Sequence, residues 1–78
     1  MAKSKKKNIC GHNVRKKRIA SGLSQQELAA KCQREGWDIG RDTIAKIESH
    51  ARWVGDFELV LISKILKISL EELVSRNL

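Results

Sequence analysis

Two four-residue segments of the chain, SQQE at residues 24–27 and SLEE at residues 69–72, have a pattern that begins α-helices. In this pattern the serine hydroxyl accepts a hydrogen bond from the backbone NH of the glutamate, and the glutamate carboxylate accepts one from the backbone NH of the serine. Ser24 with Glu27 and Ser69 with Glu72 therefore predict two helix starts. No proline interrupts the 78 residues, so we expect an all-helical chain.

Hydrophobic spacing and turn residues divide the chain into five expected helices. Their approximate bounds are residues 11–20, 24–36 and 41–49, followed by helices that begin at Asp56 and at Ser69. Gly22 and Gly36 stop the first two helices, because glycine readily adopts the left-handed conformation that ends many helices. Asp56 is a favourable N-cap. We therefore expect one small all-α domain over residues 9–78.

The fourth expected helix is apolar over most of its circumference. Five of its residues are expected to pack inward: Phe57, Val60, Leu61, Ile65 and Leu66. A strand over LVLISKILKI is the alternative, because β-branched residues are frequent there, but the helix-start signals on both sides favour a helix. A helix that is apolar on every side expects burial on every side. The surplus predicts a homodimer contact through the C-terminal helices.

Positive charge is concentrated near the N-terminus. The chain has 16 Lys and Arg against 9 Asp and Glu, a formal net charge of +7. Eight of the cations lie in the first 18 residues, and no acidic residue precedes Glu27. Such a balance favours a polyanionic partner such as nucleic acid. For residues 1–8 two interpretations are open: a basic disordered arm that reaches phosphates, or a solvated head without a partner.

Several classes of function are disfavoured by what the sequence lacks. No apolar segment is long enough to cross a membrane and no secretory signal is present, so we expect free thiols at Cys10 and Cys32 in a reducing cytoplasm. These cysteines, with His12 and His50, lack the close pairing of zinc sites, so no metal or cofactor is expected. Neither a small-molecule ligand nor an enzymatic activity is expected, because no phosphate-binding loop or nucleophile elbow occurs.

The third expected helix lies in GRDTIAKIES, residues 40–49, and has two different flanks. On a helical wheel Ile44 and Ile47 share one side. The opposite side carries Asp42, Ala45, Lys46 and Ser49, with Arg41 at its edge. A polar and cationic face suits the major groove of DNA, where base edges accept from Arg and Lys and cytosine N4 donates to a carboxylate. A merely solvated face has the same composition, so the pattern alone leaves both interpretations open.

The order of these segments resembles a known family. GLSQQELAAK at residues 22–31 followed by DTIAKIES at residues 42–49 is similar to the helix-turn-helix domain of the lambda repressor and Cro family. The resemblance extends from about Ile9 to Val74. It implies five helices and a sequence-specific double-stranded DNA-binding transcriptional regulator, with repression as the expected direction. In that family the third helix enters the major groove and the second crosses the DNA backbone.

The resemblance also implies roles for individual residues. The base-contacting residues would be Arg41, Asp42, Thr43 and Lys46, and the backbone-contacting residues would be Gln25, Ser49 and Arg52. Arg18 and Glu48 match a partly buried ion pair between the first and third helices. His50 stands where the family often has glycine, and Ala51 stands where a lysine is frequent. Arg52 is therefore the main cation left in the loop after the third helix.

The connection between the second and third helices is longer than in the shortest members of that family. We expect an additional turn at QREG, residues 33–36, before Trp37 and Ile39. Trp37 is interpreted as a core or lid residue. For Trp53 two roles are open, packing against the domain or flanking the sugar-phosphate chain. Packing is favoured, because large aromatic side chains usually bury most of their area.

A protein-interaction module is the main alternative to a DNA-binding function. An antitoxin-like or coactivator-like helical domain would use its outward residues to contact another protein. The salt dependence of binding separates the two. Phosphate contacts make the affinity for DNA fall steeply with salt, whereas an apolar contact between proteins is much less sensitive.

Overall fold

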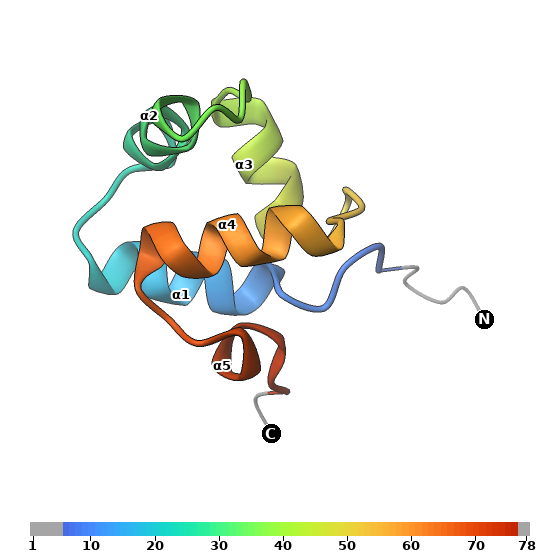
Figure 1. The fold of residues 1–78 in the computed structure, drawn as a ribbon. Coiled ribbons are helices and arrows are strands. Elements are labelled where there is room, and N and C mark those ends of the chain that lie inside the picture. Colours follow the sequence, from blue (N-terminus) through green and yellow to red (C-terminus); the bar gives the residue numbers. More distant parts are fainter. Residues whose placement is uncertain (1–5, 77–78) are drawn as a thin grey trace.

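The computed structural model describes residues 6–76, and over this part of the chain it contains five α-helices and no strand (Figure 1). The helices are α1 (Gly11–Ala20), α2 (Gln25–Arg34), α3 (Arg41–Glu48), α4 (Asp56–Leu66) and α5 (Leu70–Val74). The predicted all-α fold of five helices is confirmed, and the strand considered for residues 59–68 is wrong. α1 packs against α3, α4 and α5. α2 and α3 lie on one side of α1 and α4, and α5 lies on the other (Figure 1).

Serine side chains cap α2 and α5, as the sequence predicted. Ser24 Oγ accepts from the backbone NH of Glu27 at 3.0 Å, and the Glu27 carboxylate accepts from the backbone NH of Ser24 at 2.7 Å. The hydrogen bond from the Ser24 backbone NH to the carboxylate lowers the pKa of Glu27. At α5 the serine half of the predicted pattern is present: Ser69 Oγ accepts from the backbone NH of Glu72 at 3.0 Å. Each bond satisfies a donor that the helix itself leaves unpaired.

The start of α4 differs from the prediction. Its N-cap is Gly55, and Asp56, the predicted N-cap, is already the first helical residue. The Glu58 carboxylate accepts from the backbone NH of Gly55 at 3.1 Å, which is the glutamate half of a capping box. Asp56 Oδ1 instead accepts from the backbone NH of Phe57 at 2.7 Å. The N-cap therefore lies one residue before the predicted one, and Asp56 belongs to the first turn of α4.

Four helices end with the same backbone arrangement. Within two residues of the end of α1, α2, α3 and α4 lies a residue with a positive φ. These residues are, in order, Gly22 (75°), Gly36 (91°), His50 (65°) and Lys67 (57°). At the end of α3, the Ala51 NH donates to the Lys46 carbonyl at 2.8 Å. This Schellman arrangement satisfies carbonyl groups that the last turn leaves unpaired. Glycine adopts it readily, whereas His50 and Lys67 hold a conformation that residues with a Cβ disfavour.

All five helices contribute to the core. Its most enclosed side chains are Val14 on α1, Leu28 and Cys32 on α2, Ile44 and Ile47 on α3, Ile62 on α4 and Leu73 on α5. Ile39 precedes α3 and Val54 follows it, and both belong to the same core. α3 is therefore fixed by apolar contacts at each end as well as along its buried flank.

α4 buries only part of the side that was predicted to face the core. The residues predicted to pack inward divide into buried Leu66, half-buried Leu61 and Ile65, and exposed Phe57 and Val60. Phe57 is 86% exposed, whereas Ile62, which was not predicted, is buried. The reason is that α1, α2 and α5 contact only part of the circumference of α4. An apolar helix surface is left facing solvent.

Asn8 lies in the segment for which a basic arm or a solvated head is predicted, and it is bonded to the folded domain. Its amide nitrogen donates to the carbonyls of Ile47 and Arg52 at 3.0 and 2.8 Å. Its side-chain oxygen accepts from the backbone NH of Gly11 at 2.8 Å. Asn8 therefore caps α1 and joins it to the end of α3. The rest of the predicted arm includes residues 1–5, which lie outside the described residues.

Gly11 allows the start of α1 to approach α3 closely, and its substitution tests this contact. A Cβ at position 11 would lie 2.3 Å from the Ile47 carbonyl oxygen and 3.0 Å from that of Glu48. We expect Gly11→Ala to lower the free energy of unfolding, measured in urea, by about 1–3 kcal/mol, as at other overpacked sites. Gly40→Ala is the control, because a Cβ there meets no atom within 4 Å. Equal losses in the two variants would contradict the close approach.

Candidate nucleic-acid interface

α3 presents one flank to the core and the other to solvent. Ile44 and Ile47 are buried. The side chains of Arg41 and Asp42 are 59% and 87% exposed, and Lys46 is exposed as well. The structure has the division that the spacing predicted, and the outer flank is open within the described part of the chain.

The open flank of α3 carries charges of both signs. Arg41 Nη2 lies 3.7 Å from Asp42 Oδ1, and an exposed pair of this kind contributes little to stability. Thr43 is half-buried at the edge of the flank. Ser49 Oγ donates to the Lys46 carbonyl at 3.2 Å. The Ser49 hydroxyl must therefore turn away from this carbonyl before it can donate to a phosphate.

A buried ion pair fixes α3 against α1. Arg18 Nε donates to Glu48 Oε2 at 2.6 Å, and Arg18 Nη2 donates to Glu48 Oε1 at 3.1 Å. Only 10% of the Arg18 side chain and 3% of the Glu48 side chain are exposed. Arg18 Nη1 donates to the Leu23 carbonyl at 2.7 Å. The hydrogen bonds with Glu48 raise the pKa of Arg18, so the guanidinium stays charged although it is buried.

The N-terminus of α2 lies beside this ion pair. Gln25 Nε2 donates to Glu48 Oε1 at 3.0 Å, so the first residue of α2 is joined to the last residue of α3. The backbone NH groups of Gln25 and Gln26 belong to the first turn of α2, where a helix has no carbonyl to pair with them. Such groups attract a phosphate. One NH of the Gln25 side chain is thus bonded to Glu48, and the backbone NH groups at the start of α2 are further donors available for an anion.

The loop after α3 is anchored to the N-terminal segment. His50 Nδ1 lies 3.1 Å from the Asn8 carbonyl oxygen, and Nδ1 must carry the proton because a carbonyl only accepts. The Lys7 NH donates in return to the His50 carbonyl at 2.9 Å. Lys7, which we had also assigned to the basic arm, is therefore held at the C-terminal end of α3.

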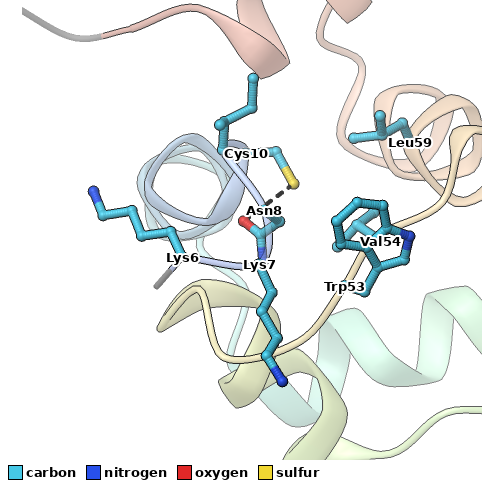
Figure 2. Close-up of a pocket in the computed structure, with 8 residues that line it drawn as sticks. Lys6, Lys7, Asn8, Cys10, Trp53, Val54 and Leu59 are labelled. Atoms are coloured by element: carbon cyan, nitrogen blue, oxygen red, sulfur yellow. Dashed lines mark hydrogen bonds between the residues drawn. The ribbon is translucent and has the colours of Figure 1, made fainter. Parts of the chain in front are cut away.

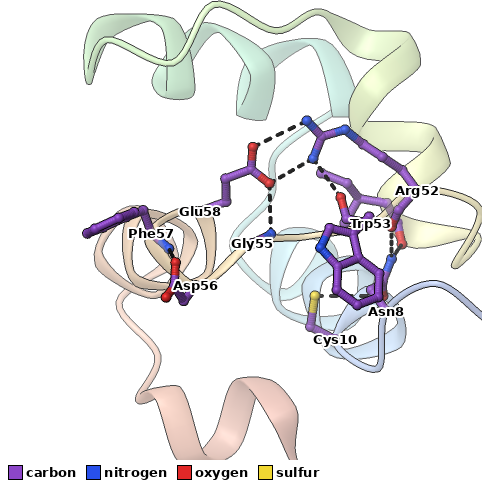
Figure 3. Close-up of polar contacts among 9 residues, drawn as sticks. Asn8, Cys10, Arg52, Trp53, Gly55, Asp56, Phe57 and Glu58 are labelled. Carbon is purple, nitrogen blue, oxygen red and sulfur yellow. Dashed lines mark hydrogen bonds and ion pairs between the residues drawn. The ribbon is translucent and has the colours of Figure 1, made fainter.

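Glu58 holds Arg52, the residue predicted to contact the DNA backbone in this loop (Figure 3). Arg52 Nη1 and Nη2 donate to the two carboxylate oxygens of Glu58 at 2.9 and 3.2 Å. Nη1 also donates to the Trp53 carbonyl at 2.9 Å. The guanidinium carbon lies 5.7 Å from the centre of the Trp37 ring, a cation–π distance. The hydrogen bonds from Arg52 lower the pKa of Glu58.

Trp37 closes the longer connection between α2 and α3. It packs against the core, in agreement with the role expected for it. Its backbone NH donates to the Cys32 carbonyl at 2.9 Å, across the end of α2. Gln33 Nε2 donates to the Ile39 carbonyl at 2.7 Å. These bonds fix the additional residues as an ordered turn.

Trp53 does not pack into the domain, so the role that we favoured for it is wrong. It is 72% exposed, whereas its neighbour Val54 is buried. In an extended segment adjacent side chains face opposite directions, so Val54 takes the place in the core. Trp53 forms one wall of an apolar groove of about 260 Å³ (Figure 2). The groove is lined by Lys6, Lys7, Asn8, Ile9, Cys10, Trp53, Val54 and Leu59.

Both cysteines are buried and free. Burial raises the pKa of the Cys32 thiol to about 11 and also raises that of Cys10. Thiols that stay protonated at neutral pH are poor nucleophiles and poor metal ligands. Over residues 6–76 no group of three or more His, Cys, Asp or Glu side chains is placed to hold a metal ion. No helix in that range is long and apolar enough to cross a membrane.

α2 and α3 are joined by a turn. The outer flank of α3 is open, and its inner flank is fixed by the buried ion pair between Arg18 and Glu48. A family model described as helix-turn-helix matches residues 14–73. The chain belongs to the helix-turn-helix family. This family is of the lambda-repressor-like type, and the match runs from α1 to α5. Membership identifies the protein as a DNA-binding regulator. Searches among characterised proteins and among solved structures found no significant match.

Three residues that shape this helix-turn-helix domain were not predicted from the sequence. Asn8 and Glu58 both satisfy NH groups at helix starts, and their spacing from those starts was an available signal. Asn13 Nδ2 donates to the carbonyls of Leu73 and Ser75 at 2.9 and 2.8 Å, which ties α5 to α1. The sequence gives no pattern that links a buried asparagine on one helix to backbone carbonyls about 60 residues away.

The ion pair gives a direct test of how α3 is held. We expect Glu48→Ala to lower the free energy of unfolding by about 3–5 kcal/mol, because Arg18 would stay buried without its partner. Lys46→Ala changes an exposed residue of the same helix and should alter the free energy of unfolding by no more than about 0.5 kcal/mol. Thermal and urea unfolding of both variants measure the difference. Equal midpoints would show that the pair does not hold α3 in place.

Proposed function

We propose that this protein is a sequence-specific regulator that inserts α3 into the major groove of double-stranded DNA and acts as a repressor. The open flank of α3, opposite buried Ile44 and Ile47, is the observation that carries the proposal. Arg41 and Lys46 donate to base acceptors, Asp42 accepts from cytosine N4, and Thr43 contacts a base or a phosphate. These pairings follow from the groups that base edges present in the major groove.

Phosphate contacts position the domain on the duplex in this proposal. The NH groups at the N-terminus of α2, beside Gln25, bind one phosphate. Ser49 and Arg52, at and after the C-terminal end of α3, contact the backbone at the other end of the helix. Both side chains have internal partners in the free protein, the Lys46 carbonyl and Glu58, and exchange them for phosphate.

Two copies of the chain bind together in this proposal, through α4 and α5. The support is apolar surface on these helices: Phe57, Val60 and Leu70 are all exposed. A two-fold dimer would present its α3 helices to half-sites about 34 Å apart, which implies a pseudo-palindromic operator. Bound at a promoter in the cytoplasm, the dimer would exclude polymerase by occupancy.

A protein-interaction module without sequence readout is the second candidate. The exposed apolar side of α4 is the observation that favours it, because such a surface suits a protein partner. The two candidates differ in the force that holds the partner. Duplex binding loses affinity with a logarithmic slope of about −0.9 per phosphate neutralised, whereas an apolar contact lacks this dependence.

Selection of bound duplexes from a random-sequence pool tests the proposed readout. We expect the unaltered protein to enrich a preferred sequence and Lys46→Ala to relax the preference at one or two positions, at a cost of about 1–3 kcal/mol for the lost base contact. Lys67→Ala, at the end of α4, is the control for the loss of one positive charge. An unchanged preference with Lys46→Ala would remove Lys46 from the base-reading residues.

Sedimentation velocity tests the dimer. We expect Phe57→Ser to raise the dimer dissociation constant at least about tenfold, because aromatic residues at the centre of an interface contribute about 2 kcal/mol or more. Ile19→Ser is the matched control, since Ile19 is an exposed apolar residue on α1. A dissociation constant that Phe57→Ser leaves unchanged would exclude this surface as the dimer contact.

A further inference from the structure

We propose that Glu58 competes with DNA phosphate for Arg52 and so lowers the affinity of the protein for DNA of any sequence. The inference rests on the proposed function, since it assigns a role within the same interface. Glu58 lies on α4, and neither the residue spacing of α3 nor the family match indicates a role for its carboxylate.

The contact between Arg52 and Glu58 uses the Nη1–Nη2 edge of the guanidinium, one of the edges that can bind a phosphate through two hydrogen bonds. Arg52 Nη1 and Nη2 donate to separate oxygens of Glu58 at 2.9 and 3.2 Å, a two-pronged pairing (Figure 3). Phosphate oxygens accept from arginine in the same two-pronged way. A phosphate that approaches this edge must displace the carboxylate before it can pair with both nitrogens. A phosphate that approaches Nε instead meets a guanidinium whose charge Glu58 already offsets.

Glu58 is held in position independently of Arg52. Glu58 Oε1 accepts from the backbone NH of Gly55 at 3.1 Å, which is part of the α4 cap. The residue also lies in the first turn of α4, where the helix dipole favours a negative charge. The carboxylate thus has an anchor on α4 in addition to its contact with Arg52.

Arg52 is also held in place by its other contacts. The Trp53 carbonyl accepts from Nη1 at 2.9 Å, and the Trp37 ring lies beside the guanidinium. Together with Glu58, these contacts hold Arg52 in one orientation.

The pair lies where an outside anion can reach it. The Arg52 side chain is 32% exposed and the Glu58 side chain 29% exposed, so neither is sealed in the core. The loop that carries Arg52 directly follows α3. Glu58 therefore cancels one positive charge at the edge of the candidate interface, and the sequence-independent attraction to phosphates loses one contact.

Glu58→Gln isolates the competition from the structural role of the residue. The glutamine oxygen can still accept from the Gly55 NH, so the cap of α4 is kept while the negative charge is removed. We expect the affinity for a random-sequence duplex to rise about eightfold at about 0.1 M salt, because one added phosphate contact steepens the logarithmic salt slope by about 0.9. Fluorescence anisotropy between about 50 and 200 mM salt measures both quantities.

Two controls separate this effect from a change in net charge. Glu71→Gln, at an exposed position on α5, alters the net charge by the same amount far from Arg52 in sequence. Arg52→Gln removes the cation, and in its background Glu58→Gln should raise affinity no more than Glu71→Gln does. Loss of the ion pair lowers stability, so partial unfolding of Glu58→Gln cannot produce the expected gain in binding.

The outcomes distinguish this inference from the function on which it rests. A gain with Glu58→Gln that disappears with Arg52→Gln supports the competition. A gain equal to that of Glu71→Gln, or one that persists without Arg52, overturns the inference and leaves DNA binding intact. If the unaltered protein and all variants fail to bind duplex even at low salt, the proposed function fails and the inference fails with it.

Discussion

The buried ion pair between Arg18 and Glu48 is the interaction on which the candidate interface depends. Apolar contacts of Ile44 and Ile47 bring α3 to the core, but such contacts are not directional. The hydrogen bonds of Glu48 with Arg18 and Gln25 are directional, and they join α3 to both α1 and α2 at distances of 2.6 to 3.1 Å. The outward direction of the opposite flank of α3 is fixed by these bonds. A surface that reads DNA requires such fixed geometry.

Much of the fold could be predicted because its helix ends are marked by local chemistry. Ser24 and Ser69 cap helices through their own side chains, and Gly22 and Gly36 adopt the left-handed conformation that ends them. Ends of this kind involve only residues a few positions apart. The buried side of α4 could not be predicted in the same way. A helix that is apolar nearly all round has no periodic signal, and only the placement of α1, α2 and α5 decides that Phe57 faces solvent.

The candidate site shows the same limit for charged residues. The exposure of Arg41 and Lys46 follows from helical spacing, but the pairing of Arg52 with Glu58 depends on how the loop turns before α4. The count of 16 Lys and Arg therefore overstates the number of cations that are free to bind a phosphate. Lys64 is similarly paired with Glu35 at 3.1 Å, at the end of α2. Only cations without such partners can pair freely with a phosphate. The sequence alone does not separate them from cations that are paired within the domain.

Asn8 and Lys7 hold the N-terminal segment against the end of α3, whereas α5 lies on the opposite side of α1 (Figure 1). A fluorescent label or tether attached to Lys7 would begin next to the end of α3, beside the face proposed to meet DNA, and would crowd it. The same attachment after α5 would begin on the far side of the domain. The direction from which this protein is tethered thus decides whether an immobilised copy can still reach a duplex.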